Sequence, residues 1–378
     1  MAKKMVKLGD VATYINGYAF KPEDRGKIGL PIIRIQDLTG NSYDLGFYDG
    51  MYPQKIEINN GDILISWSAS LGVYIWNRGK ALLNQHIFKV EFDKMDIDKK
   101  YFVFAVRHKL KEMGRKTHGA TMKHIVKKDF DGTEIPYPPY KEQVEIANNL
   151  DKIFRIIELQ NQELKLLDEL VRSRFVELFG DPELNPMGWE KVTLNDVCSS
   201  IVRGPFGSAL KKEFFVEPSE TTYKVYEQKH AIQKSASIGT YYITQEKYRE
   251  LKRFECLPGD ILMSCSGTMG ELYQLPEGCE KGVINQALCK FTLNDKILPV
   301  CFLVYMQQTI GKLETKGSGI QNIAAVSYIK QMPINLPPME VQKKFERFVH
   351  QIDKSKFGHL SMLTMMKSAC DQQTFIYP

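Results

Sequence analysis

Apolar residues recur at alternating spacings of three and four through residues 141–178, a segment without glycine or proline. This spacing places them on one face of an α-helix and is typical of a coiled-coil seam. The predicted seam positions are Ile146, Leu150, Ile153, Ile157, Gln160, Leu164, Leu167 and Val171. A helix of this length extends roughly 57 Å at 1.5 Å per residue. Pro138 and Pro139 precede it and Gly180 and Pro182 follow it, as expected for a helix start and stop.

A second segment, residues 339–370, repeats the same arrangement. Its seam positions are Phe345, Val349, Ile352, Lys356, His359, Leu363, Met366 and Cys370, each 199 positions after its counterpart. The shared offset predicts two halves of one duplicated plan whose helices pair with each other. Gln160 and His359 are then polar seam residues that set the register at some cost in stability. The alternative is two separate amphipathic helices, each packed on its own domain.

The repeat extends beyond the helices. Residues 61–66 (GDILIS) recur as 259–264 (GDILMS), and Asn84-Gln85 recurs as Asn285-Gln286. We therefore predict a tandem duplication of about 190 residues, each copy a globular part followed by a long helix. The expected boundaries are 1–139 for the first globular part, 140–180 for the central helix, 181–338 for the linker and second globular part, and 339–378 for the C-terminal helix and tail.

Within each globular part, short apolar runs bounded by glycine and proline predict buried strands. These runs cover residues 32–36, 62–66, 73–76 and 87–90 in the first part, and residues 223–226 and 261–263 in the second. Helical periodicity covers residues 99–113 and 300–313. Because strands crowd together and do not alternate regularly with helices, the pattern favours an α+β fold over a doubly wound sheet.

Composition narrows the class of protein. The 378 residues, 43% of them apolar, suffice for two or more domains with real cores. The N-terminus has no apolar run of signal-peptide length, and no stretch approaches the ~18 apolar residues of a membrane span. Seven cysteines without a CxxC pair indicate reduced, mostly buried thiols in a cytosolic protein.

Charge is unevenly distributed along the chain. Residues 107–128 contain eight Lys or Arg and one acid, a local charge of +7, whereas the whole chain carries +6. The helix at 141–178 has six basic and eight acidic residues. We therefore expect the helix to act as a scaffold and the basic window to be a contact surface for nucleic acid.

Signals for catalysis are weak. Residues 137–140 (YPPY) resemble the Asn/Asp-Pro-Pro-Tyr/Phe motif of adenine methyltransferases, but the leading polar residue is missing, and the repeat reads LPPM at 336–339. No phosphate-binding GxxxxGK[ST] loop, HExxH motif or clustered metal-ligand set occurs. We expect no catalytic residue and no metal site, although a nuclease built on dispersed carboxylates stays open.

Signals for nucleic-acid contact recur in both halves. Serine-rich turns suit phosphate oxygens, and Asn, Gln and Arg side chains pair with base edges. The candidate residues of the first half are Arg34, Gln36, Ser66, Trp67, Ser68, Ser70, Asn84, Gln85, His86, Arg115, Lys116, His118, Thr121 and Lys123. Those of the second half are Arg203, Ser208, Lys211, Gln228, Lys229, Ser264, Ser266, Thr268, Asn285, Gln286, Ser318 and Gln321. Each one alone is equally compatible with an ordinary polar turn.

The duplicated units, the GDILIS and GDILMS strands, the Pro-Pro helix entries with Gln143 and Gln342, and the FGDPELNPMGW linker resemble the DNA-specificity (S) subunit of type I restriction–modification systems. The resemblance implies two target-recognition domains separated by two long antiparallel coiled-coil helices. Each domain would read one half of a bipartite double-stranded DNA site in the bacterial or archaeal cytoplasm. The helices would dock two methyltransferase (M) subunits, and restriction (R) subunits would join the full complex. S-adenosylmethionine, ATP and Mg²⁺ would belong to those partners, and this chain would hold no cofactor.

One departure from the family pattern is the methionine-rich C-terminal helix with Lys356 in its seam, which predicts a shorter second helix or one partly docked on another chain. Two rival functions remain. A stand-alone methyltransferase or nuclease would turn over DNA with labelled S-adenosylmethionine or Mg²⁺ without partners. A coiled-coil scaffold would protect no split DNA site in a footprint.

Overall fold

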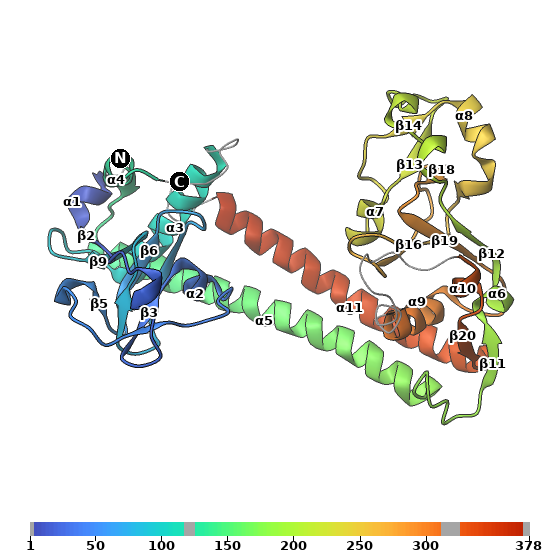
Figure 1. Ribbon diagram of the computed structural model, residues 1–378, viewed down its shortest axis with the longest axis horizontal. Helices are drawn as coiled ribbons and strands as arrows, with labels where there is room; N and C mark the ends of the chain where they lie inside the picture. Colours follow the sequence, from blue (N-terminus) through green and yellow to red (C-terminus); the bar gives the residue numbers. More distant parts are fainter. Residues whose placement is uncertain (1–3, 117–124, 311–325, 373–378) are drawn as a thin grey trace. The chain divides into compact units, whose positions relative to one another are not determined.

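The computed structural model describes residues 4–116, 125–310 and 326–372. The chain forms two compact units, one of residues 1–161 with 361–378 and the other of residues 162–360. Two long helices, α5 (Tyr140–Phe179) and α11 (Met339–Gln372), each contribute residues to both units (Figure 1). The observed helices match the predicted segments 141–178 and 339–370 closely, and α11 is the shorter one, at 34 residues against 40.

The first unit is an α+β domain built on small sheets. Its strands are β1 (Met5–Lys7), β2 (Thr13–Asn16), β3 (Leu30–Ile33), β4 (Phe47–Tyr48), β5 (Glu57–Ile58), β6 (Ile63–Ser66), β7 (Gly72–Ile75), β8 (Ala81–Leu83), β9 (Ile87–Glu91) and β10 (Glu134–Pro136). Its shorter helices are α1 (Leu8–Val11), α2 (Ile35–Thr39), α3 (Lys99–Lys116) and α4 (Lys127–Asp131), with 3-10 turns η1 (Pro22–Asp24) and η2 (Gln54–Ile56). The sheet orders are β2-β9-β6-β7, β4-β3-β8-β5 and β1-β10.

The second unit repeats this architecture. Its strands are β11 (Glu190–Thr193), β12 (Cys198–Arg203), β13 (Tyr223–Tyr226), β14 (Tyr242–Ile243), β15 (Glu255–Cys256), β16 (Ile261–Ser264), β17 (Leu272–Gln274), β18 (Gly282–Ile284), β19 (Leu288–Leu293) and β20 (Pro333–Leu336). Its helices are α6 (Leu194–Val197), α7 (Gln228–Ile232), α8 (Gln245–Glu250), α9 (Pro299–Thr309) and α10 (Val326–Lys330), with η3 (Gly207–Ala209), η4 (Lys212–Phe214) and η5 (Lys252–Phe254). The sheet orders β12-β19-β16-β17, β14-β13-β18-β15 and β11-β20 correspond one for one to those of the first unit.

The predicted strand at residues 32–36 is wrong in its second half. β3 ends at Ile33, and Ile35 and Gln36 belong to α2. Arg34 is the N-cap residue, because its backbone N–H donates to the Asp37 carboxylate at 2.8 Å and so starts a helix. The predicted fold class is confirmed, since antiparallel sheets and helices are segregated and each unit has one parallel strand pair, β3–β8 or β13–β18.

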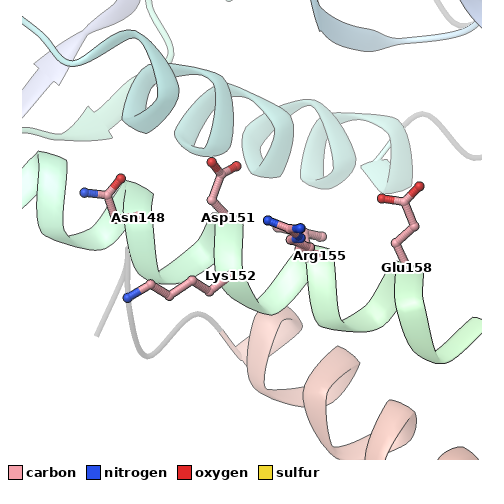
Figure 2. A pocket seen from close by; sticks show the side chains of 6 residues that line it. Asn148, Asp151, Lys152, Arg155 and Glu158 are labelled. Atoms are coloured by element: carbon pink, nitrogen blue, oxygen red, sulfur yellow. The ribbon is translucent and has the colours of Figure 1, made fainter.

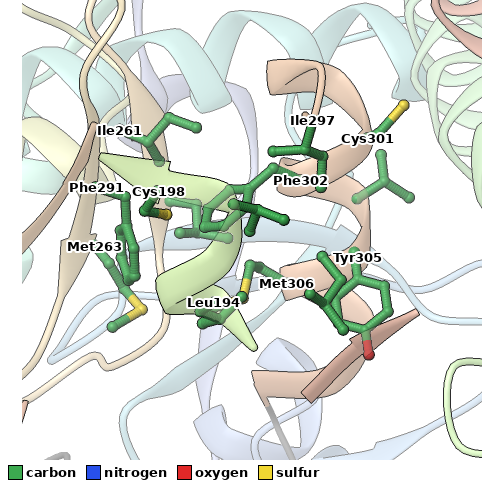
Figure 3. Packing of buried hydrophobic residues seen from close by; sticks show 14 of the residues in the cluster. Leu194, Cys198, Ile261, Met263, Phe291, Ile297, Cys301, Phe302, Tyr305 and Met306 are labelled. Carbon is green, nitrogen blue, oxygen red and sulfur yellow. The ribbon is translucent and has the colours of Figure 1, made fainter. Parts of the chain in front are cut away.

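Each unit has a main core between its antiparallel four-stranded sheet and helix α3 or α9. In the second unit, Ile261 of β16 and Phe291 of β19 pack with Phe302 and Met306 of α9 (Figure 3). All four residues of β6 and of β16 are buried, which explains why the two GDIL segments are continuous apolar runs and do not alternate. The seven cysteines are free thiols, five of them buried.

A buried glutamine joins each long helix to its globular unit. Gln143 in α5 accepts a hydrogen bond from the Asp98 N–H at 2.9 Å and donates to the Pro138 carbonyl at 2.8 Å. Gln342 in α11 accepts from the Leu298 N–H at 2.8 Å and donates to the carbonyls of Lys296 and Pro337 at 2.9 and 3.0 Å. The Pro-Pro-x-x-(x)-Gln pattern therefore ties the start of the long helix to the segment that leads into α3 or α9.

Candidate nucleic-acid interface

The first unit brings predicted contact residues together where two parallel strands end. Ile33 of β3 lies beside Leu83 of β8, and the Asn84 N–H donates to the Ile33 carbonyl at 3.0 Å. The chains that follow carry Arg34 and Gln36 on one side and Asn84, Gln85 and His86 on the other. We call the residues Tyr18, Arg34, Gln36, Asn84, Gln85 and His86 the first rim.

A glycine holds a second loop against the first rim. A Cβ on Gly17 would lie 2.0 Å from the Asn84 carbonyl oxygen, so only glycine permits this approach. The next residue, Tyr18, donates its N–H to the Leu83 carbonyl at 2.8 Å and accepts from the Gln85 N–H at 2.9 Å. The backbone of Tyr18 is therefore fixed beside the Asn-Gln pair, and the residue is 43% exposed. Tyr18 was not among the predicted contact residues.

Two predicted residues of the first rim have internal roles. The Arg34 guanidinium lies 3.2 Å from the Asp37 carboxylate and also bonds to the Asp44 carbonyl. The Gln36 amide oxygen, in the orientation that satisfies both of its ends, accepts from Arg34. Gln85 and Gln36 are exposed, so their side chains are the accessible hydrogen-bonding groups of this rim.

The serine turn of the first unit is held together by its own hydroxyl. Ser66 is fully buried, and its Oγ donates to the Ser70 carbonyl at 2.6 Å. Ser68 is also buried, whereas Ser70 is exposed. Trp67 stacks on Phe88 with ring centroids 5.6 Å apart. The structure therefore corrects the expectation of direct DNA contact at Ser66 and Ser68, because neither side chain is accessible.

The second unit forms an equivalent rim. Tyr226 of β13 lies beside Ile284 of β18, and the Asn285 N–H donates to the Tyr226 carbonyl at 2.9 Å. A Cβ on Gly204 would lie 1.9 Å from the Asn285 carbonyl oxygen, which repeats the glycine contact of the first unit. We call Arg203, Phe206, Ser208, Gln228, Lys229, Asn285 and Gln286 the second rim.

The serine turn of the second unit has the same internal bond. Ser264 is buried, and its Oγ donates to the Thr268 carbonyl at 2.7 Å. The Gln228 amide donates to the same carbonyl at 3.1 Å and to the Ser266 carbonyl, so α7 is tied to this turn. Lys229 pairs with Glu227 at 2.6 Å. Ser264 is inaccessible, while Gln286, Ser208, Lys211 and Thr268 are exposed.

One residue of the predicted basic window packs against aromatic rings of the first unit. The Arg107 guanidinium lies over the rings of Phe104 and Phe154, which stack 5.5 Å apart and join α3 to α5. Burial lowers the pKa of Arg107, and the Asp151 carboxylate opposes that shift. Figure 2 shows Asp151 pointing from α5 toward α3, where it pairs with Lys100.

The rest of the window is only partly described. Lys109 and Lys127 pair with Glu112 and Asp131 at 2.9 and 2.7 Å. Seven predicted contact residues, or their side chains, lie outside the described part of the chain: Arg115, Lys116, His118, Thr121, Lys123, Ser318 and Gln321. Their role stays a prediction.

The two long helices pair antiparallel within the second unit. Phe175 and Phe179 of α5 contact Phe345 of α11 at centroid distances of 5.5 and 5.3 Å, and Asp168 pairs with Lys356 at 2.6 Å. From residue 151 to 170, only Ile153, Ile157, Gln160, Leu164 and Leu167 are shielded from solvent. From residue 350 to 368, only Ile352, Lys356, His359, Leu363 and Met366 are shielded. These are the predicted seam positions.

The ends of the seam serve the globular cores as well. Ile146 and Leu150 pack in the core of the first unit, and Val171, Phe345 and Val349 in the main core of the second. The expectation of helix pairing at Ile146 and Leu150 is therefore corrected: their neighbours are core residues of the first unit. The His359 Nδ1 lies 3.5 Å from the Glu163 carboxylate, which places a polar contact at the edge of the seam.

The arrangement offers hydrogen-bonding, aromatic and basic groups at two similar rims. Among the described residues, no three His, Cys, Asp or Glu side chains gather as a metal site. In the same part of the chain, no helix combines the length and apolarity needed to cross a membrane. The exposed side chains of the two rims include groups that can hydrogen-bond and stack.

Comparison with known proteins yields consistent matches. A family model described as the type I restriction modification DNA specificity domain matches residues 2–169 and again residues 186–359. The type I restriction enzyme EcoBI specificity subunit of Escherichia coli is 22% identical over 92% of this chain and 78% of its own length.

Two solved structures share the fold. One, from work on complex assembly and conformational transition of a type I R-M system, covers 100% of this chain and 98% of its own at a TM-score of 0.62 and 15% identity. The type I restriction–modification S subunit from M. genitalium covers 98% of this chain and 94% of its own at a TM-score of 0.51 and 15% identity.

Proposed function

The chain belongs to the type I restriction modification DNA specificity family, and on that premise we propose that its two rims each read one half of a bipartite double-stranded DNA site. Its function is DNA specificity in a type I restriction–modification system. In this proposal the chain has no catalytic activity of its own. Methyltransferase subunits bind S-adenosylmethionine, and restriction subunits with ATP and Mg²⁺ complete the assembly.

The observation that carries the proposal is the repetition of one frame with different side chains. Gly17 and Gly204 make the same close approach to Asn84 and Asn285, and the two serine turns close with the same hydroxyl bond. The frame exposes Tyr18 and Gln36 in one unit and Phe206 and Ser208 in the other. A common frame with unlike side chains suits two different half-sites, since base edges are distinguished by donor and acceptor pattern.

The outer surface of the helices supports docking of a protein partner. Ile156, Leu159, Leu166 and Leu170 of α5 are exposed, at helical spacings that place them on a face next to the seam. Phe357 of α11 is 75% exposed. Apolar side chains in a row on a surface mark interaction sites. We assign this stripe to the methyltransferase subunits.

Selection from a pool of duplexes with a randomised centre tests the reading of DNA. The chain is purified with a methyltransferase subunit that co-elutes with it, and bound duplexes are sequenced. We expect two short fixed elements separated by a spacer of constant length. Gln85→Ala should relax one element and Gln286→Ala the other, whereas Gln351→Ala on the exposed face of α11 should change neither. A single contiguous element, or relaxation of both elements by either rim variant, would refute the division of labour.

Salt dependence tests the basic window. Charge reversal at Lys116, Lys123 and Lys127 should weaken binding and flatten its dependence on salt concentration, because fewer phosphates are neutralised. Reversal of three exposed lysines of α11, Lys343, Lys344 and Lys354, to Glu serves as the charge-matched control. Equal affinity of window variant and wild type at every salt concentration would remove the window from the interface.

Partner docking is separated from helix pairing by two kinds of variant. Leu164→Asp or Leu167→Asp places a charge in the seam and should disrupt the pairing of α5 and α11. Leu166→Asp, on the exposed stripe, should leave the fold intact and prevent co-elution with the methyltransferase in gel filtration. Arg172→Asp, off the stripe, is the control. Methyl transfer by the chain alone with labelled S-adenosylmethionine, or DNA cleavage with Mg²⁺, would contradict the non-catalytic assignment.

A further inference from the structure

The second rim carries an exposed phenylalanine, Phe206. It is 80% exposed, although an aromatic ring normally loses most of its surface on folding. It lies in the segment 204–207 (GPFG) that follows β12. Neither hydrogen bonding nor charge explains a phenylalanine in solvent, because the ring has neither.

The backbone holds Phe206 in a defined place. The Gly204 N–H donates to the Leu288 carbonyl at 3.0 Å, and the missing side chain of Gly204 lets the loop touch Asn285. Pro205 is buried, and the Phe206 carbonyl accepts from the Ala209 N–H at 3.1 Å. An exposed ring on a braced loop is ready to contact a ligand with little loss of conformational freedom.

The neighbours of Phe206 are those of a DNA contact. Its loop touches the Asn285-Gln286 segment, where a Cβ on Gly204 would lie 3.0 Å from the Gln286 nitrogen. Lys211 and Lys212, both exposed, follow the loop at the start of η4. The loop that carries Phe206 is therefore joined to the segment of the Asn-Gln pair on one side and leads to two exposed lysines on the other.

The first unit offers an aromatic at the matching loop but presents it differently. Tyr18 follows Gly17, is 43% exposed, and lies edge-on to Phe20 with centroids 5.0 Å apart. Phe20 in turn contacts Tyr48 at 5.1 Å. Tyr18 is thus backed by other rings at the first rim, whereas Phe206 projects into solvent.

We propose that Phe206 inserts between two neighbouring base pairs of the half-site read by the second unit and partly unstacks them. This inference rests on the proposed function and adds a shape-reading contact to it. An apolar side chain between base steps bends DNA, and the energy of opening a step depends on its sequence. Tyr18, supported from behind, makes no such insertion, so the distortion is confined to one half of the site.

Permanganate oxidation tests the insertion, because it modifies thymines that have lost stacking. The probe is the set of duplexes recovered from the randomised pool by the full chain with its methyltransferase. The half-site of the second unit is the one relaxed by Gln286→Ala. We expect one reactive step in that half-site and none in the other.

The variant Phe206→Ala should abolish this reactivity and weaken binding about 10-fold, within the range of one aromatic–base contact. Phe206→Leu keeps an apolar side chain that can insert, so it should retain most of the permanganate reactivity and most of the binding affinity. Tyr43→Ala, an exposed aromatic of the first unit, is the control and should change neither. Circular dichroism should give Phe206→Ala an unchanged unfolding midpoint, because the ring packs on little.

Two results overturn the inference by different routes. Undiminished permanganate reactivity in Phe206→Ala, with the split site still selected, removes the insertion and leaves the proposed function standing. A wild-type chain that selects no split site overturns the proposed function, and the insertion with it.

Discussion

The two globular units share their backbone devices and differ in what those devices present. Asp62 of the first unit accepts from the Asn59 N–H and pairs with Lys89, and Asp260 of the second accepts from the Leu257 N–H and pairs with Lys290. The glutamine at each helix entry repeats as well. The segments at the rims differ. The N-cap residue that follows the parallel strand is the basic Arg34 in the first unit and the acidic Glu227 in the second.

This difference separates two kinds of constraint. The shared residues hydrogen-bond to backbone groups at turns and at the starts of helices, and these groups need a partner wherever the fold recurs. Exposed rim side chains such as Gln85 and Ser208 are less constrained than Arg34 and Gln228, which hydrogen-bond within their own units. A duplicated protein of this kind can therefore change the DNA it reads while keeping its architecture.

The largest expected difference between the two units is in their stability towards one substitution, at the phenylalanine cluster that joins α5 and α11 in the second unit. Phe345 has no exposed surface and contacts both Phe175 and Phe179. Phe345→Ala should lower the free energy of unfolding of that unit by about 3–5 kcal/mol. The loss is measured from the hydrogen-exchange rates of the α9 amides as a function of urea concentration. The amides of α3 report any effect on the first unit. Phe357→Ala should cost less than about 0.5 kcal/mol.

The next effect tests whether the rim glycines are equivalent. Gly17→Ala and Gly204→Ala each drive a Cβ to within 2.0 Å of a backbone carbonyl, and we expect each to cost about 3 kcal/mol. Thermal unfolding measures the loss. Gly358→Ala, in α11 with open space around it, should instead stabilise by up to about 1 kcal/mol. A tolerated Gly204→Ala beside a damaging Gly17→Ala would show that the two loops are not the same device.

A smaller effect ranks the two buried glutamines. Gln342→Leu leaves the Leu298 N–H and the carbonyls of Lys296 and Pro337 without their partner, whereas Gln143→Leu deprives only two backbone groups. Since a buried group without its hydrogen bond costs about 1–3 kcal/mol, Gln342→Leu should be the more damaging in urea denaturation. The exposed Gln351→Leu controls for the substitution itself. Equal costs would mean that water replaces the third bond.

The smallest effect is a pH dependence confined to the second unit. Burial lowers the pKa of His230, whose Nδ1 accepts from the Glu227 N–H at 2.8 Å and whose Nε2 lies 2.7 Å from the Ile238 carbonyl. The unfolded chain takes up a proton near pH 6.5 and the folded chain only at lower pH, so stability falls as the pH drops below about 6.5.

Hydrogen exchange of α7 between pH 7.5 and 5.5, corrected for intrinsic rates, should show this loss of protection. The first unit has Asp37 at the equivalent position, so α2 is the internal reference. His230→Gln should remove the pH dependence. Protection of α7 that stays constant across this range would contradict the assignment.

The periodic segments were predictable from sequence, and isolated polar residues were not. The spacing of three and four marked the helices because a helix surface has that period whatever lies around it. Residues 32–36 were predicted as one strand, but the capping bond between Arg34 and Asp37 turns the chain into α2. Phe206 was not among the predicted contact residues, because the exposure of a single aromatic side chain leaves no periodic pattern in the sequence.

By itself, the sequence determined the duplication, the two long helices with their seam and the α+β class, because these depend on periodicity and repetition along the chain. Only the tertiary structure decided which candidate contact residues reach solvent. Ser66 and Ser70 look alike in sequence, yet one hydroxyl is buried and closes the turn while the other residue is exposed. Exposure depends on contacts between segments distant along the chain, such as Gly17 with Asn84 and Gly204 with Asn285, and a one-dimensional pattern does not contain them.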